Sequence, residues 1–299
     1  MKNTKKPVDM REFAFVVTKP LQFLFAAGII RQLGISDQSF LVVTNSFRDA
    51  EAVCERASRA DWDLSSMDIR FCADRSEAEQ YATRLGVRTL FVDSDVGLRR
   101  FLLLLKTQLG LKRPQIWVYE EGLGSYRTDL YKQDIKHRLF DALGIGTHFG
   151  GSRLTRGIYV CEPSLFRERF PDQVVEVRKI ARTPCEIIEG NLKEWSRIFD
   201  YVPVSPSSET ACALYLTDWS VHPDGVARLN EFPGDKYMKP HPHIKEIPAV
   251  TGVELISATP PAELVLIDLL GTYQSVTVFH HGSSCEKYVG DQRVSYVLV

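Results

Sequence analysis

The chain has 299 residues, of which 44% are hydrophobic and 25% charged, so it is long enough for two globular domains with buried cores. Its formal net charge of −1 argues against nucleic acid as a partner. No run approaches the ~18 apolar residues of a membrane span, and no apolar signal segment follows the basic residues 1–6. We therefore expect a cytoplasmic protein. The basic start would allow peripheral contact with the inner membrane surface, although a solvated tail is the commoner arrangement.

The first 120 residues alternate between apolar runs of strand length and helical patterns. Strands are predicted at 13–18, 39–44, 68–72, 88–92 and 115–119, and helices at 21–30, 47–59, 76–85 and 96–109. Apolar strands that alternate with helices indicate a parallel sheet covered on both faces. Ligands of such sheets bind at the carboxyl ends of the strands.

Weaker patterns continue to a linker. A helix is predicted at 131–143, a glycine-rich loop at 144–157, strands at 157–161 and 174–180, and a helix at 191–199. Residues 203–208, rich in proline and serine, are the best linker in the chain. We expect one domain over residues 1–202 and a second over residues 203–299.

The last hundred residues carry a second α/β pattern. Strands are predicted at 212–217, 237–239, 253–256 and 275–280, a helix at 262–270, a loop at 223–234 and a strand-like end at 294–299. The predicted fold class is α/β, with two Rossmann-like domains that face each other across a cleft.

The six cysteines are far apart in the sequence and show no CxxC spacing. We read them as reduced core residues rather than metal ligands. No DxD motif and no cluster of histidine and aspartate ligands is visible, so no metal site is predicted.

Residues 235–243 gather two lysines and two histidines around Pro240 and Pro242. Proline fixes its own φ and biases the preceding residue away from helix, so we expect His241 in an extended segment at a strand end. Imidazole titrates near neutrality, so it can donate to a phosphate oxygen or transfer a proton. Read alone, the stretch is equally an exposed polar loop.

Glu120 and Glu121, followed by Gly122, stand where the fifth predicted strand ends. A carboxylate there, with its pKa raised by burial or by its neighbour, can act as a general base for a hydroxyl. Consecutive strand residues face opposite ways, so only one should act, and we favour Glu120 because it is nearer the strand. The alternative is an exposed acidic turn.

Ser283 and Ser284 follow the strand predicted at 275–280. Their hydroxyl and N–H groups suit a phosphate if a helix begins there, and a plain helix N-cap is the alternative. Glu263 lies in the first turn of the helix at 262–270. It could accept hydrogen bonds from vicinal ribose hydroxyls or simply complement the helix dipole.

Together these motifs resemble those of the bacterial sialyltransferases and polysialyltransferases of the GT-B fold. That group carries an acidic-acidic-Gly motif, an HP motif and a Ser-Ser or Ser-Thr motif in this order, which here are 120–122, 241–242 and 283–284. Residues 17–22 are similar to a Thr-Pro-Leu-Gln run common in the group, with Lys19 inserted, and residues 239–242 are similar to its longer HP motif.

The resemblance implies an inverting, metal-independent glycosyltransferase without a cofactor. It would move sialic acid, a related nonulosonic acid or Kdo from a CMP-sugar donor to a hydroxyl of a glycan acceptor, in surface polysaccharide or lipooligosaccharide synthesis. It implies an acceptor-side first domain and a nucleotide-sugar-binding second domain. The acidic motif supplies the base and His241 meets the donor phosphate. The nucleotide-binding residues that it implies are Lys239, Glu263, Ser283 and Ser284.

Two other functions stay open. A GT-B transferase with a UDP- or GDP-sugar donor would need more positive charge near His241, which Lys236, Lys239 or Lys245 could supply. A non-catalytic nucleotide- or glycan-binding protein would bind CMP without turnover. A second HP dipeptide, His222-Pro223, lies in the predicted 218–225 loop and ranks below His241. Residues 217–219, Thr-Asp-Trp, match no pattern that we can name.

Overall fold

The computed structural model describes residues 11–110, 112–131, 135–205, 208–244 and 250–299. The chain divides into two compact units. The first contains the residues up to Ser46 together with Ala50–Thr183, and the second contains Phe47–Asp49 and Pro184–Val299. The basic start, residues 206–207 of the predicted linker and Lys245 lie outside the described residues.

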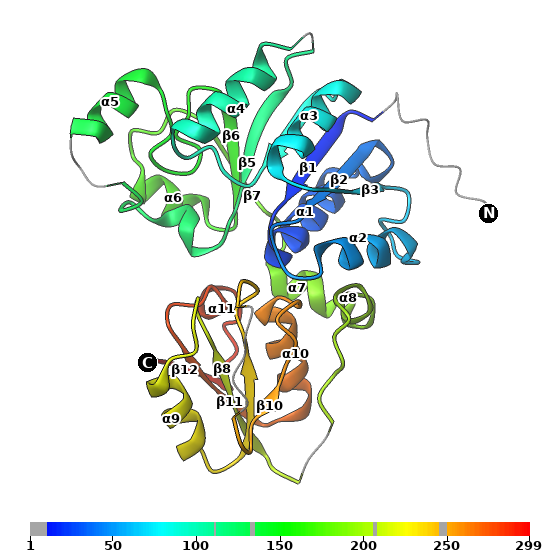
Figure 1. Cartoon of the computed structure of the whole chain (residues 1–299), viewed down its shortest axis with the longest axis vertical. Coiled ribbons are helices and arrows are strands. Elements are labelled where there is room, and N and C mark those ends of the chain that lie inside the picture. Colours follow the sequence, from blue (N-terminus) through cyan, green and yellow to red (C-terminus); the bar gives the residue numbers. More distant parts are fainter. Residues whose placement is uncertain (1–10, 111, 132–134, 206–207, 245–249) are drawn as a thin grey trace. The chain divides into compact units, whose positions relative to one another are not determined.

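The first unit is built on a seven-stranded parallel sheet with the order β3-β2-β1-β4-β5-β6-β7 (Figure 1). The strands are β1 (Phe13–Val17), β2 (Ser39–Thr44), β3 (Asp68–Cys72), β4 (Thr89–Val92), β5 (Gln115–Tyr119), β6 (Thr155–Val160) and β7 (Glu176–Lys179). The order reverses between β1 and β4, since β2 and β3 lie on one side of β1 and the later strands on the other. Open parallel sheets bind their ligands outside such a reversal.

The helices of the first unit are α1 (Pro20–Leu33), α2 (Ala50–Arg59), α3 (Arg75–Leu85), α4 (Leu98–Gln108), α5 (Ile135–Leu143) and α6 (Pro163–Arg169), with short 3-10 turns η2 (Ser36–Gln38) and η3 (Leu123–Tyr126). Alternate residues of the central strands pack against α3 and α4 in one core cluster. α6 was not predicted, although Pro163 at its first position is a helix-start signal.

Helix α1 fixes the chain that follows β1. Pro20 occupies its first turn, where the missing N–H costs nothing. Gly34 ends it with a φ of 65°, a conformation that glycine adopts without strain. Every residue from Pro20 to Ile30 is buried, so α1 is a core helix that is apolar on nearly all sides. The Thr18-Lys19 turn before it is therefore anchored at both ends.

The second unit is built on a five-stranded parallel sheet with the order β10-β9-β8-β11-β12. The strands are β8 (Ala211–Leu216), β9 (Asp235–Lys239), β10 (Glu254–Leu255), β11 (Ser275–His280) and β12 (Val294–Leu298). Here the order reverses between β8 and β11. Both units are therefore α/β with parallel sheets, as predicted, and both strand orders are compatible with Rossmann-like folds.

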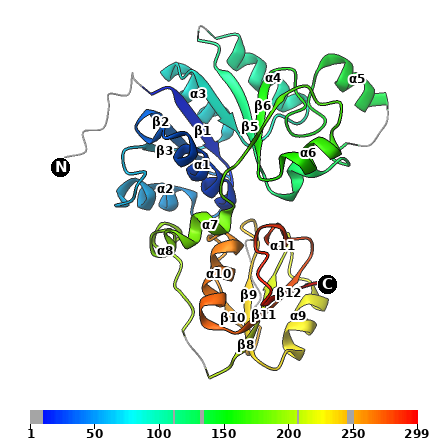
Figure 2. The same ribbon diagram turned by 180° about the vertical axis from the view of Figure 1, so that it is seen from behind.

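The helices of the second unit are α7 (Pro184–Glu189), α8 (Leu192–Phe199), α9 (Pro223–Glu231), α10 (Ala262–Thr272) and α11 (Cys285–Tyr288). α9 lies on one face of the sheet and α10 on the other (Figures 1 and 2). The strand residues that face α9, among them Tyr215 and Phe279, form a core cluster with Leu229 of that helix. None of the helices in the described residues is long and apolar enough to cross a membrane.

The last strand of the first sheet, β7, precedes the boundary expected after Val202, and the first strand of the second sheet, β8, follows it. The compact units divide earlier, after Thr183, because α7 and α8 pack against α10. Trp195 and Phe199 of α8 are fully buried, so this helix belongs to a packed core rather than to a linker.

The prediction of a loop at 223–234 is wrong, because residues 223–231 form α9. Pro-Asp-Gly reads as a turn, yet Pro223 and Asp224 are also good first-turn residues of a helix. Gly225 is needed for packing, because a Cβ there would lie 2.3 Å from the Tyr215 ring. The close contact with the sheet outweighs the low helix propensity of glycine.

Asp95, which follows β4, holds the loop that leads into β6. Its Oδ1 accepts from the N–H of Gly150 at 2.9 Å. Its Oδ2 accepts from the N–H of Ser152 at 2.9 Å and from Oγ1 of Thr155 at 2.7 Å. The side chain is completely buried, so no water could replace it as an acceptor.

We expect Asp95→Ala to lower the free energy of unfolding of the first unit by roughly 3 kcal/mol, since three buried donors lose their acceptor. Asp95→Asn keeps one carbonyl acceptor and should lose about half as much. Urea unfolding followed by circular dichroism measures both. The matched control is Asp129→Ala, which removes an exposed carboxylate of the same unit. Equal stabilities for Asp95→Ala and this control would refute the assignment.

Candidate functional site

Glu120 is a buried anchor at the carboxyl end of β5. Its side chain is fully buried, and its Oε2 accepts from the hydroxyl of Tyr126 at 2.8 Å and from the N–H of Cys161. The Tyr126 hydroxyl in turn accepts from the N–H of Glu162 at 3.1 Å. Burial and the Glu120 carboxylate both raise the pKa of Tyr126, so this phenol stays protonated. Glu120 therefore ties the ends of β5 and β6 together.

Glu121 occupies a different environment and forms an ion pair with Lys19, from the turn after β1. Its side chain is 19% exposed, and its N–H donates to Oγ of Ser125 at 2.8 Å. A Cβ at Gly124 would lie 2.2 Å from Oε2 of Glu121, so the glycine makes room for this carboxylate. Of the two predicted base candidates, the geometry favours Glu121, because it is the one that reaches the surface.

A charged network that the sequence motifs did not predict lies beside the pair of Lys19 and Glu121. Oγ1 of Thr18 donates to Oδ2 of Asp93 at 2.8 Å, and Arg75 forms an ion pair with the same carboxylate. These residues come from the ends of β1 and β4 and the start of α3, at the reversal of strand order. Burial lowers the pKa of Lys19, while Asp93 acts against this and Arg75 adds to it. The acidic residues directly after the strand at 88–92 were the visible signal.

His241 lies just after β9, at the strand end where the sequence predicts it. Its N–H donates to Oγ1 of Thr217 at 2.9 Å, which links the end of β9 to the end of β8. Its ring centroid is 4.9 Å from that of Trp219 and 5.1 Å from that of His243. Trp219 and His243 stack with centroids 4.7 Å apart and an interplanar angle of 4°. His241 is thus one member of a three-ring group.

Lys239 and Glu263 are buried on the α10 side of the sheet, at 4% and 2% exposure. Nζ of Lys239 donates to the carbonyls of Ala258 at 3.3 Å and Pro240 at 3.4 Å. Burial raises the pKa of Glu263, opposed by its own N–H, by Lys239 and by Ser284. Lys239 therefore holds the backbone beside His241 and Pro242 through these carbonyls, and its ammonium group is not available to a ligand.

The serine pair lies directly before α11, so a helix does begin there. The N–H groups of Gly282 and Ser283 donate to Nδ1 of His280 at 3.1 and 3.0 Å. Oγ of Ser283 accepts from the N–H of Cys285 at 3.2 Å, and Oγ of Ser284 donates to Oε1 of Glu263 at 3.3 Å. Burial lowers the pKa of His280, which keeps its ring neutral and able to accept.

A second polar group lies on the α9 side of the same edge and was not predicted as a site. Nε2 of His222 is 2.9 Å from both Oδ1 of Asp218 and Oγ of Ser220. The hydroxyl of Tyr215 accepts from the N–H of His222 at 3.1 Å and lies 3.0 Å from Nε2 of His281. Burial would raise the pKa of Asp218, but hydrogen bonds from Ser220 and His222 outweigh it and the pKa is lowered.

The structure thus brings the predicted residues of the second unit to one edge of its sheet, the carboxyl ends of β8, β9 and β11. Glu120 and Glu121 lie at the equivalent edge of the first sheet. In the described part of the chain, no three His, Cys, Asp or Glu side chains are arranged to hold a metal ion.

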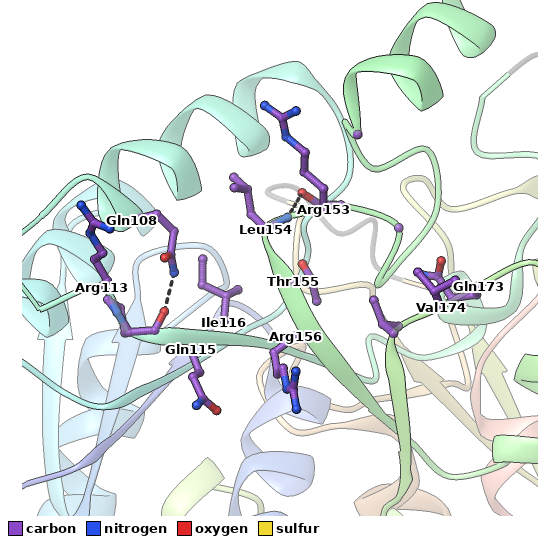
Figure 3. A pocket seen from close by; sticks show the side chains of 15 residues that line it. Gln108, Arg113, Gln115, Ile116, Arg153, Leu154, Thr155, Arg156, Gln173 and Val174 are labelled. Carbon is purple, nitrogen blue, oxygen red and sulfur yellow. Dashed lines mark hydrogen bonds between the residues drawn. The ribbon is translucent and has the colours of Figure 1, made fainter.

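A cavity of about 630 Å³ lies at the opposite edge of the first sheet. It surrounds the starts of β5 and β6, and Arg113, Arg153 and Arg156 are among its lining residues (Figure 3). Its lining includes no carboxylate and none of the predicted site residues. The residues that the motifs select therefore do not line this cavity.

Comparisons with known proteins give no family assignment: no family model matches the sequence, and no curated protein matches it. The residues at the two carboxyl edges are therefore the observations from which a function can be inferred.

Lys239 should give the second unit an unusual pH dependence. Burial lowers its pKa to about 8, with Glu263 and Cys285 acting in the opposite direction, whereas an unperturbed lysine titrates near 10.5. Between these values the unfolded chain binds more protons than the folded one, so this group makes stability rise with pH. The gain is complete above 10.5 and is lost as the pH falls through 8. The difference between the two pKa values corresponds to about 3 kcal/mol of stability.

We expect Lys239→Met to remove this rise, so that the stability difference between variant and wild type changes between pH 8 and 10. Urea unfolding at pH 7, 8, 9 and 10 measures it. Lys236→Met, on the same strand, is the control and should follow the wild type. Parallel curves for the wild type and Lys239→Met would show that the buried ammonium does not titrate in this range.

Proposed function

We propose that this chain is an inverting, metal-independent glycosyltransferase with a GT-B architecture. It moves sialic acid, a related nonulosonic acid or Kdo from a CMP-sugar donor to a hydroxyl of a glycan acceptor, in surface polysaccharide or lipooligosaccharide synthesis. The observation that carries the proposal is the placement of the motifs. The acidic motif and the HP and serine motifs all lie at carboxyl edges of parallel sheets, where such folds bind ligands.

The second unit suits the leaving nucleotide. CMP departs as a phosphate monoester, so charge grows on its phosphate as the glycosidic bond breaks, and a donor aimed at that oxygen stabilises it. His241 can supply this hydrogen bond and a proton. The hydroxyls of the serine pair lie at the same sheet edge, and Glu263 positions the hydroxyl of Ser284.

The first unit suits the acceptor. In an inverting transfer the acceptor oxygen attacks the anomeric carbon opposite the leaving phosphate, and a carboxylate removes the hydroxyl proton. Glu121 is the carboxylate at the surface, where it pairs with Lys19. Glu120 supports it from the core through Tyr126 and Cys161.

The burial of Lys239 removes one of the three lysines that a UDP- or GDP-sugar donor could use. A diphosphate carries more negative charge and needs exposed cations near His241. Lys239 is 4% exposed and directs its ammonium to carbonyl oxygens, so it does not serve this purpose. CMP binding without turnover would instead indicate the non-catalytic function.

Glu121→Gln should lower kcat by a factor of roughly 10²–10⁴, the usual worth of general-base assistance, and leave the Kd for CMP nearly unchanged. His241→Ala should lower turnover and weaken CMP binding together, because His241 contacts the phosphate. Steady-state kinetics with a CMP-sugar and calorimetric CMP titrations measure these effects.

Glu120→Gln is the matched comparison, since it changes the neighbouring carboxylate in the same way. Its main effect should be on the unfolding midpoint, because a buried acceptor becomes a donor. If Glu121→Gln keeps near-normal turnover while Glu120→Gln loses it in a stable protein, the roles of the two residues are reversed. If both keep turnover, the mechanism is wrong.

The same mechanism predicts that turnover survives metal removal, because side chains and N–H groups rather than a cation meet the phosphate. Activity assayed with excess EDTA should equal activity with added Mg²⁺ or Mn²⁺. Activity lost in EDTA and restored by either ion would count against the proposal.

A further inference from the structure

The turn from Thr217 to His222 exposes a large aromatic side chain at the candidate donor site. Trp219 is 72% exposed, whereas the other three tryptophans of the chain are at most 7% exposed. It is held in place, because it stacks on His243 and contacts the ring of His241. A fixed indole with an open surface is suited to packing against a planar or puckered ring of a ligand.

Polar groups that suit a sugar lie in the same turn as this indole. Asp218 stays ionised and Ser220 offers a hydroxyl, and both lie next to Trp219 in the sequence. Nε2 of His222 is 2.9 Å from Oγ of Ser220, and the His222 ring centroid is 4.3 Å from that of His281. Together these residues provide acceptors for sugar hydroxyls and imidazoles that can donate to a carboxylate. A turn that presents an aromatic face and such polar groups suits the two sides of a pyranose ring, one of C–H groups and one of hydroxyls.

The two faces of the second sheet indicate which part of the donor lies here. Tyr215 faces α9, and its hydroxyl carries His222 and His281 on that side. Ser284 and Glu263 lie on the α10 side. His241 lies at the carboxyl edge of the sheet, just after the end of β9. The phosphate of a CMP-sugar joins the ribose to the transferred sugar, so a ribose on the α10 side directs the transferred sugar to the α9 side.

We infer that Trp219, with Asp218, Ser220, His222 and His281, forms the subsite for the sugar that is transferred. This inference rests on the proposed function, since it takes His241 as the phosphate contact. The indole packs on the C–H face of the sugar ring, and the polar groups bind its hydroxyl and carboxylate groups. Trp219 is therefore a specificity-determining residue, which tells a CMP-sugar from CMP.

Calorimetric titration with two probes tests this. One is CMP, and the other is a non-transferable CMP-sialic acid that carries fluorine at carbon 3 of the sugar. The wild type should bind the analogue more tightly than CMP. Trp219→Ala should weaken binding of the analogue on the order of tenfold, the usual cost of losing an aromatic anchor, and leave CMP binding unchanged. Trp219→Phe should keep most of the affinity.

Tryptophan fluorescence gives a second readout. Because Trp219 is the exposed tryptophan, the analogue should change the emission more than CMP does, and Trp219→Phe should remove that change. The control variant is Arg228→Ala, which alters an exposed side chain of α9 and should bind both probes as the wild type does. Trp219 and Arg228 are both exposed, so neither substitution should leave a cavity in the core. Circular dichroism spectra of the variants that match the wild type check this.

The outcomes separate this inference from the proposed function. If Trp219→Ala weakens CMP and the analogue equally, the indole contacts the nucleotide, and the sugar subsite is overturned while the donor site stands. If analogue binding by Trp219→Ala equals that of the wild type, the subsite is also overturned. If the wild type binds neither probe, the proposed function fails and the subsite fails with it.

Discussion

All-parallel strand pairing is the constraint on which the other features of this chain depend. Parallel hydrogen bonding brings the carboxyl ends of all strands in a sheet to one edge, whatever their order in the sequence. The order then reverses at β1/β4 in the first unit and at β8/β11 in the second, so the connections leave in opposite directions. Side chains placed directly after these strands gather at one edge, and this explains why His241 and Trp219 meet although 21 residues separate them.

The polar groups at these edges differ in burial. The buried ones hold the turns in place through hydrogen bonds, and the more exposed ones can reach a ligand. Glu120 and Glu121 are neighbours in the chain, yet one is fully buried under Tyr126 and the other reaches the surface beside Lys19. Lys239 and His241 show the same division. A buried polar group must be satisfied by protein partners, so Glu120 and Lys239 are committed to hydrogen bonds that hold the turns. In the mechanism that we propose, the reactive roles fall to their more exposed neighbours, Glu121 and His241.

In the second unit, polar groups lie at the carboxyl ends of the strands on both faces of a single sheet. The α10 side holds Glu263 and Ser284, and the α9 side holds Asp218, Ser220 and His222. Tyr215 of β8 carries His222 and His281 through its hydroxyl, and Thr217, just after the strand, holds the backbone of His241. The carboxyl end of one short strand thus positions three histidines.

The sequence by itself determined the strands, most of the longer helices and the edge at which the polar motifs lie. Apolar runs bounded by turn residues placed the strands of both sheets to within a few residues, because burial on both faces demands an uninterrupted apolar pattern. It did not determine α9, since Pro-Asp-Gly is equally a turn and the packing of Gly225 on Tyr215 decided the matter. Only the tertiary structure decided which carboxylate is exposed, that Lys239 is buried, that Trp219 stacks on His243, and that His222 and His281 lie together beside Tyr215. The physical reason is that exposure and side-chain pairing depend on neighbours distant in the chain, whereas strand and helix patterns are local.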